Sequence, residues 1–202
     1  MTRAQAYDLA VVGAGIVGLA HAAAAVERGL RVVVVERSTA IVGASVRNFG
    51  HACITAQSGP AREYAERARG RWLRYAAQAG FWARETGTLV VARADDERAV
   101  LDEWVRGEPG VTLLDADEVA GRAPVVGALG GAFLPRDLQV DPREAAPALA
   151  RHLAGLGVRF VWRTSALGAS PGVLHTSRED IPAQAVVVAV GHDVDQLYPA
   201  IA

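Results

Sequence analysis

Three glycines near the start of the chain have the spacing of a phosphate-binding turn. Gly13, Gly15 and Gly18 stand in GAGIVG, directly after the β-branched run DLAVV at 8–12. In such a turn the first glycine permits the tight bend, and the second lets the backbone approach a pyrophosphate. The third glycine lets the following helix pack closely on the strand. This spacing therefore predicts nucleotide chemistry, although a glycine-rich turn without a nucleotide would look similar.

The flanking residues predict the elements that position this turn. Strong helix formers follow it up to Gly29, a suitable stop. Ile16 and Val17 then lie at the helix N-terminus, where free N–H groups and a partial positive charge favour phosphate. RVVVVER at 31–37 is apolar on both faces, as expected for a parallel strand covered by helices on each side. Strand, turn, helix and strand together predict a βαβ dinucleotide-binding unit.

An acidic residue stands where the nucleotide ribose is expected. Glu36 ends the second predicted strand, and its carboxylate can accept hydrogen bonds from the ribose hydroxyls of an adenosine. A carboxylate at this place disfavours a 2′-phosphate, so NADP is disfavoured. The βαβ unit by itself does not distinguish FAD from NAD.

Four stretches of the sequence resemble the FAD-dependent D-amino acid oxidase and glycine/sarcosine oxidase superfamily. Residues 8–37 resemble its N-terminus, and GASVRNFG at 43–50 is similar to its small-Ser-x-Arg-Asn-x-Gly loop. Residues 127–167, which include QVDP, are similar to the family segment that leads into a helix and a third Rossmann strand. Residues 183–199 resemble its late strand with an Ala-x-Gly turn. The likeness extends over nearly the whole chain.

The resemblance implies an α/β fold with two parts. A Rossmann-like FAD-binding domain, a parallel sheet with flanking helices, would be formed by residues 1–78 and 141–202. Residues 79–140 would be the beginning of an α+β substrate domain. The residues agree locally, because Asp141 is a candidate N-cap and Pro142 suits the first helical position.

The resemblance also assigns roles to the loop VGASVRNFGHAC at 42–53. Its Ala-Ser-x-Arg end would contact phosphate, and its Asn-x-Gly-His end would approach the flavin, although an exposed arginine explains Arg47 equally well. Phe49 is expected to pack in the core. The cofactor-binding residues expected from the turn, the acidic strand end and the resemblance are Gly13, Gly15, Ile16, Val17, Gly18, Glu36, Arg37, Ala44, Ser45, Arg47, Asn48, Gly50, His51, Ala166, Ala189 and Gly191.

No catalytic residue is assigned, and no metal site is expected. His51 is the flavin-side candidate, able to orient a substrate, tune the ring or carry a covalent bond. Cys53 is expected to be a small buried hydrophobe. No His/Cys grouping in the sequence has metal-ligand spacing.

Composition excludes several other classes of function. The 21 basic and 22 acidic side chains give a net charge of −1, so neither nucleic acid nor an anionic membrane is an expected partner. Aromatic residues in the charged stretch 59–85 fit an amphipathic helix, or two short ones, better than a nucleic-acid helix.

Residues 9–26 lack charge, but the glycine fingerprint explains them better than a membrane span or signal peptide. One cysteine suits a reducing compartment, and a cytoplasmic location is expected.

The function implied by the resemblance is FAD-dependent oxidation of a small amine. Hydride would pass from the substrate to flavin N5, the imine would hydrolyse, and oxygen or another acceptor would take the electrons. Amino acids and N-methyl amino acids are possible substrates, and NFGHACITAQSG at 48–59 resembles an aminophosphonate-associated subgroup. The C-terminal half of the family is expected to be missing, and oligomeric state stays open. The alternatives are a non-catalytic nucleotide-binding fragment and a flavin dehydrogenase acting on a hydroxy acid or glycerol phosphate.

Overall fold

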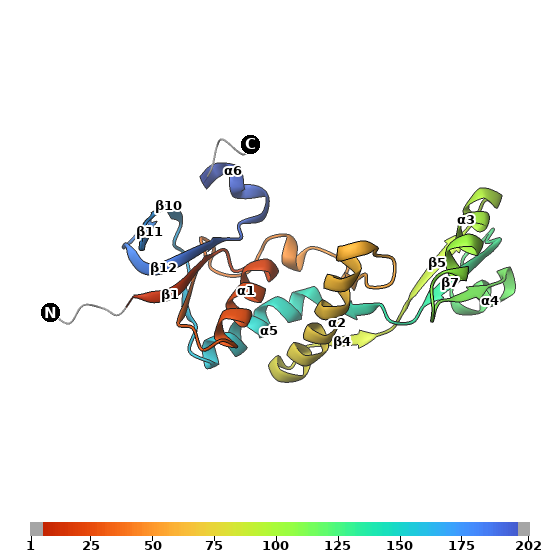
Figure 1. The fold of residues 1–202 in the computed structure, drawn as a ribbon, viewed down its shortest axis with the longest axis horizontal. Helices are drawn as coiled ribbons and strands as arrows, with labels where there is room; N and C mark the ends of the chain where they lie inside the picture. The colour runs from red at the N-terminus through yellow and green to blue at the C-terminus, as the bar shows by residue number, and fades with distance from the viewer. Residues whose placement is uncertain (1–5, 198–202) are drawn as a thin grey trace. The chain divides into compact units, whose positions relative to one another are not determined.

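The computed structural model describes residues 6–197 and divides the chain into two compact units. Unit 1 contains Met1–Phe49, Tyr75–Trp82 and Asp141–Ala202, and unit 2 contains Gly50–Arg74 and Ala83–Val140. Both α-helices and strands occur in each unit (Figure 1).

Unit 1 is built on a six-stranded sheet with the order β10-β11-β12-β1-β2-β9. The four strands from β12 to β9 are parallel, and β10 and β11 add an antiparallel hairpin at one edge. The strands are β1 (Tyr7–Val12), β2 (Val32–Val35), β9 (Arg159–Val161), β10 (Ala166–Ser170), β11 (Val173–Thr176) and β12 (Ile181–Val188).

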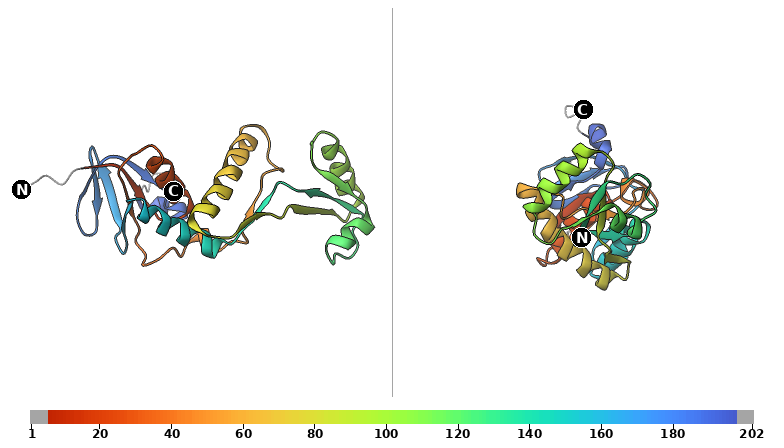
Figure 2. Two further views of the ribbon diagram at one scale, coloured as in Figure 1. Left: turned by 90° about the horizontal axis from the view of Figure 1, so that it is seen from below. Right: turned by 90° about the vertical axis from the view of Figure 1, so that its right-hand side faces the viewer.

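Two long helices of unit 1 pack beside each other, α1 (Ile16–Val26) and α5 (Pro142–Gly155) (Figures 1 and 2). Alanines dominate α1 and favour a helix that can approach the sheet closely. In α5, the Asp141 side chain caps the N-terminus by accepting the N–H of Arg143 at 2.9 Å. Short helical turns η1 (Ala44–Val46) and η2 (Gly191–Asp193) and helix α6 (Val194–Leu197) complete this unit.

The central strands of unit 1 bury side chains on both faces. Val11 faces α1, since its Cγ1 lies 3.2 Å from where a Cβ on Gly18 would stand. Ala10, Val12, Val33 and Val35 form a cluster with hairpin residues such as Leu174. On this face of the sheet, the hairpin and Leu197 of helix α6 pack against the cluster.

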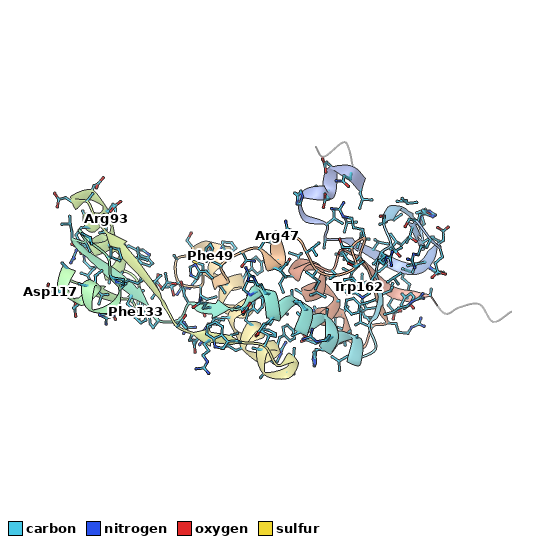
Figure 3. All side chains as sticks on the ribbon, turned by 180° about the vertical axis from the view of Figure 1, so that it is seen from behind. Arg47, Phe49, Arg93, Asp117, Phe133 and Trp162 are labelled. Carbon is cyan, nitrogen blue, oxygen red and sulfur yellow. The ribbon has the colours of Figure 1, made fainter. Side chains whose placement is uncertain are left out.

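Unit 2 contains two three-stranded antiparallel sheets, ordered β3-β8-β4 and β5-β7-β6. Helix α3 packs on the second sheet, where Ala92, Leu101, Ala132 and Leu134 form a core cluster. Arg93, Asp117 and Phe133 of this unit are labelled in Figure 3. The strands are β3 (His51–Ala52), β4 (Ala83–Glu85), β5 (Thr88–Ala92), β6 (Thr112–Leu114), β7 (Gly130–Leu134) and β8 (Leu138–Val140), and the helices are α3 (Asp95–Arg106) and α4 (Ala116–Arg122).

Helix α2 (Gly59–Ala79) is one continuous helix whose last residues belong to unit 1. The predicted boundary groups residues 50–78 with the cofactor domain, whereas residues 50–74 lie in unit 2. The physical reason is strand pairing, since β3 pairs with β8, far along the chain. Tyr75 is buried, but Tyr64 is 68% exposed, so the aromatic residues of α2 do not form one core stripe. Among residues 6–197, no helix is both long and apolar enough to cross a membrane.

Candidate nucleotide-binding site

The glycine turn joins β1 to α1 with no room for larger residues at two of its three positions. Gly13 has a φ of +101°, and a Cβ on it would lie 2.5 Å from the carbonyl oxygen of Ala189. A Cβ on Gly18 would lie 2.0 Å from the carbonyl oxygen of Gly13. At Gly18 the helix and the turn therefore approach too closely for a methyl group.

The turn stands where the strand order of the sheet changes direction. From β1 the chain passes to β2 on one side, while the late strand β12 pairs with β1 on the other. The Ala189 N–H donates to the Val12 carbonyl at 2.8 Å, which continues this pairing to the turn. In open α/β sheets, ligands bind at the carboxyl ends of the strands at such a switch point. Ala189 and Gly191, which has a φ of +63°, follow β12 there.

Glu36 links the end of β2 to the glycine turn. Its Oε2 accepts the N–H of Ala14 at 2.9 Å, and its Oε1 accepts the N–H of Ser38 at 2.9 Å. Each carboxylate oxygen has a second lone pair, so these bonds leave capacity for further donors. The predicted acidic strand end is thus held in a fixed orientation beside the turn.

Ser45 contacts the N-terminus of α1. Its hydroxyl accepts the N–H of Ile16 at 2.9 Å. A Cβ on Gly15 would lie 3.1 Å from the Ser45 Oγ, so this glycine also keeps the approach open. The turn η1 that carries Ala44 and Ser45 contacts α5, and the Asn48 side chain donates to the Ala44 carbonyl at 2.9 Å. Loop residues 44–48 therefore lie next to the helix N-terminus that the sequence predicts to bind phosphate.

Other predicted contact residues have structural partners or lie at the surface. The Arg37 guanidinium pairs with Asp193 at 2.6 Å and with Gln196 at 3.1 Å, which connects the end of β2 to η2 and α6. Val17 is exposed on the first turn of α1, and Arg47 directly follows η1 (Figure 3). Ala166 is the first residue of β10.

Phe49 corrects one expectation. The sequence predicts a core position for this residue, yet its side chain is 81% exposed (Figure 3).

Gly50 and His51 belong to unit 2, where His51 meets two residues that the sequence did not single out. The His51 Nε2 lies 3.0 Å from Asp137 Oδ2 and 2.9 Å from Thr88 Oγ1. Asp137 is fully buried, and its Oδ1 accepts the N–H groups of Ile54 at 3.0 Å and Thr55 at 2.8 Å. No local pattern links these positions. The antiparallel pairing of β3 with β8 brings Asp137 to His51, and the pairing of β4 with β8, continued by the Gly87 N–H donating to the Asp137 carbonyl at 3.1 Å, brings Thr88.

The network around Asp137 favours the ionised carboxylate. Burial by itself would raise the pKa of Asp137, but the hydrogen bonds from Thr55, His51, Ile54 and Thr88 outweigh burial and hold this pKa below its ordinary value. Asp137 therefore stays charged at neutral pH and orients the imidazole of His51.

Together, the sheet, the glycine turn at the switch point and the acidic strand end define an α/β protein of the dinucleotide-binding class. The family described as "DAO: FAD dependent oxidoreductase" matches residues 8–201, nearly the whole chain. The chain belongs to this family of FAD-dependent oxidoreductases. A comparison with curated proteins gave no significant match.

Solved structures of this type share the fold. A glycine oxidase from Geobacillus kaustophilus has a TM-score of 0.86 and 26% identity, and the match covers 98% of this chain and 59% of that one. An L-amino acid deaminase from Proteus myxofaciens, in complex with anthranilate, has a TM-score of 0.87 and 19% identity, and the match covers 96% of this chain and 48% of that one. An L-alpha-glycerophosphate oxidase from Mycoplasma pneumoniae with FAD bound has a TM-score of 0.80 and 22% identity, and the match covers 96% of this chain and 56% of that one. The chain spans about half to three-fifths of the length of these structures.

Proposed function

We propose that the chain binds FAD through unit 1 and serves the oxidation of a C–N bond in a small amine. The observation that carries the proposal is the meeting of the glycine turn, the α1 N-terminus and Glu36 at the switch point of the sheet. Membership of the FAD-dependent oxidoreductase family supports FAD as the dinucleotide.

The residues of unit 1 fit two parts of such a ligand, the pyrophosphate and the adenosine ribose. Gly13 and Gly15 leave the backbone uncovered at the N-terminus of α1, where N–H groups and the helix dipole favour the pyrophosphate. Ser45, already bonded to Ile16 N–H, offers a hydroxyl at the same place. Glu36 retains acceptor capacity for the adenosine ribose hydroxyls. When bound, FAD supplies the hydride acceptor for oxidation of the substrate.

His51 remains the proposed flavin-side residue, and its hydrogen bond to Asp137 defines the orientation of its imidazole ring. The hydrogen bond at 3.0 Å fixes the ring and favours a proton on Nε2. The chain position of His51, two residues after Phe49 at the end of the phosphate-side loop, supports this assignment.

An amino acid or N-methyl amino acid is the proposed substrate class, and an aminophosphonate is the narrower proposal. Glycine oxidase, 26% identical, supports an amine substrate. The glycerophosphate oxidase likeness extends to the fold alone, so the alternative of a hydroxyl substrate is an arm of the test.

A matched set of substrates separates these possibilities. The full chain, loaded with FAD, is mixed without oxygen with glycine, N-methylglycine, aminomethylphosphonate, glycolate and glycerol 3-phosphate, and loss of the oxidised flavin absorbance is followed. Glycine and glycolate differ only in the amino or hydroxyl group. Reduction by at least one amine but not by glycolate is the expected result. Reduction by glycolate or glycerol phosphate alone indicates the dehydrogenase alternative, and bound FAD that no substrate reduces indicates a non-catalytic binder.

A further inference from the structure

Three side chains of unit 2 that can each ligate a metal ion lie together. His51, Cys53 and Asp137 each offer one ligand atom, and these atoms all lie within 4.8 Å of one another. Asp137 is buried, whereas solvent reaches His51 and, in part, Cys53. We propose that this cluster is a binding site for a zinc ion or a similar divalent transition metal.

Strand pairing explains why the three residues meet. His51 pairs with Gln139 and Ala52 with Leu138 in the antiparallel ladder of β3 and β8. One further step in the same register sets Cys53 opposite Asp137. His51 and Cys53 are two residues apart, so they share a face of the extended chain. His51 is then the diagonal neighbour of Asp137 on that face, within reach of a long side chain.

The orientation of Asp137 directs one carboxylate oxygen toward His51, while backbone N–H groups hold the other. Its Oδ1 is held by the N–H groups of Ile54 and Thr55, and its Oδ2 faces His51 Nε2 at 3.0 Å. Two ligand atoms on a tetrahedral zinc, with bonds of about 2.0 Å, lie about 3.3 Å apart. Small side-chain movements therefore suffice for nitrogen and oxygen to bind one ion in place of the hydrogen bond between them.

The donor set suits zinc. Zinc binds imidazole nitrogen, thiolate sulfur and carboxylate oxygen, and three protein ligands leave a fourth position for water or another small ligand. Binding needs the thiolate of Cys53, so its proton passes to solvent. It also needs a ring nitrogen of His51 without a proton, so a proton on Nε2 moves to Nδ1 or to solvent. Uptake of the ion is therefore coupled to proton release.

A surface group elsewhere in the chain provides a matched comparison. His175 in unit 1 lies 2.8 Å from Ser170 Oγ and 3.0 Å from Asp180 Oδ1. It thus has a hydroxyl and a carboxylate, as His51 does, but the chain has one cysteine, and this is at position 53. His175→Gln removes a comparable group without touching the proposed site.

The test is a titration of the full chain with cobalt(II), a coloured substitute for zinc, in metal-free buffer. Tetrahedral cobalt absorbs at longer wavelengths than flavin, so the readout does not depend on FAD, and competition with zinc gives the zinc affinity. We expect one ion per chain. Cys53→Ala should weaken binding by about tenfold or more and Asp137→Asn by a similar factor, while His175→Gln leaves it unchanged. Circular dichroism confirms that each variant is folded.

Two outcomes overturn the proposal. The first is a wild-type chain that binds less than one cobalt ion at concentrations well above those of the protein. The second is a folded Cys53→Ala variant with wild-type affinity and the same absorption bands, which means adventitious binding only. Cys53→Ala is the deciding variant, because Asp137 also bonds the backbone of Ile54 and Thr55 and its substitution perturbs the fold. If the chain binds cobalt but does not bind FAD, only the function proposed for unit 1 is refuted.

Discussion

The carboxylate of Glu36 accepts the backbone N–H of Ala14 at 2.9 Å, and this bond ties the end of β2 to the glycine turn. The same carboxylate accepts the N–H of Ser38, so one side chain orders both the turn and the start of the next loop. A ribose that bonds to Glu36 therefore binds a group that is already oriented, which lowers the entropic cost of binding.

Replacing Glu36 should weaken FAD binding. Glu36→Ala removes a charged acceptor, and a hydrogen bond to a charged group contributes about 1.5–3 kcal/mol, so the dissociation constant of FAD should rise by about 10- to 100-fold. Fluorescence titration with FAD measures it. Glu179→Ala, which removes an exposed carboxylate of the same unit, should leave the affinity unchanged. Equal affinities in the two variants would refute the role of Glu36.

Substitution of Gly15 should weaken FAD binding while leaving the stability of the fold nearly unchanged. In Gly15→Ala the new methyl group meets only the Ser45 Oγ, at 3.1 Å, and a side chain can move by the small amount needed. The free energy of unfolding should change by less than about 1 kcal/mol, while FAD affinity falls by about tenfold or more because the methyl group covers the phosphate approach. Gly43→Ala, in open space, is the control. A Gly15→Ala variant with normal FAD affinity would contradict phosphate binding at this turn.

Alanine substitutions at Gly18 and Gly70 should change the free energy of unfolding in opposite directions. A Cβ at Gly18 would lie 2.0 Å from a backbone oxygen, which cannot move without shifting α1, so Gly18→Ala should destabilise the chain by about 1–3 kcal/mol. Gly70 lies within α2 with open space around it, and Gly70→Ala should stabilise by about 0.5–1 kcal/mol through helix propensity. Urea unfolding of both variants measures the difference. Equal and small effects would mean that α1 does not pack this closely.

The local part of this site follows from sequence, and the long-range part does not. The strand, turn and helix around Gly13 are consecutive in the sequence, so residue spacing and helix propensity predict them. In the same way, Asp141 as N-cap and Pro142 as the first helical residue predict the start of α5. The partners of His51 lie at Thr88 and Asp137, far along the chain. The register between β3 and β8 brings Asp137 to His51, and the pairing of β4 with β8 brings the start of β5 to the same place. The apolar ring of Phe49 predicts a core position, yet the side chain is 81% exposed, because exposure depends on the path of the chain as well as on residue type.

Asp137 should make stability depend on acidity. Its folded pKa lies below the ordinary aspartate value of about 3.9, so the unfolded chain takes up the proton first. The stabilisation is complete above that value and is lost as pH falls from about 3.9 through the lower folded pKa. Asp137→Asn should lose about 1–3 kcal/mol at pH 7 and show a weaker loss of stability in that acidic window. Denaturant midpoints across the window measure both. A variant with the wild-type pH profile would show that Asp137 does not carry this dependence.

The most direct test of FAD binding by unit 1 is whether the 202-residue chain itself retains FAD. The purified chain is loaded with FAD, freed of excess cofactor by gel filtration, and its visible spectrum is recorded beside that of Glu36→Ala. We expect about one FAD retained per chain, with the absorption bands of a protein-bound flavin, and a clearly lower content in the variant. A folded wild-type chain that emerges colourless, and whose stability added FAD leaves unchanged, would contradict FAD binding by unit 1.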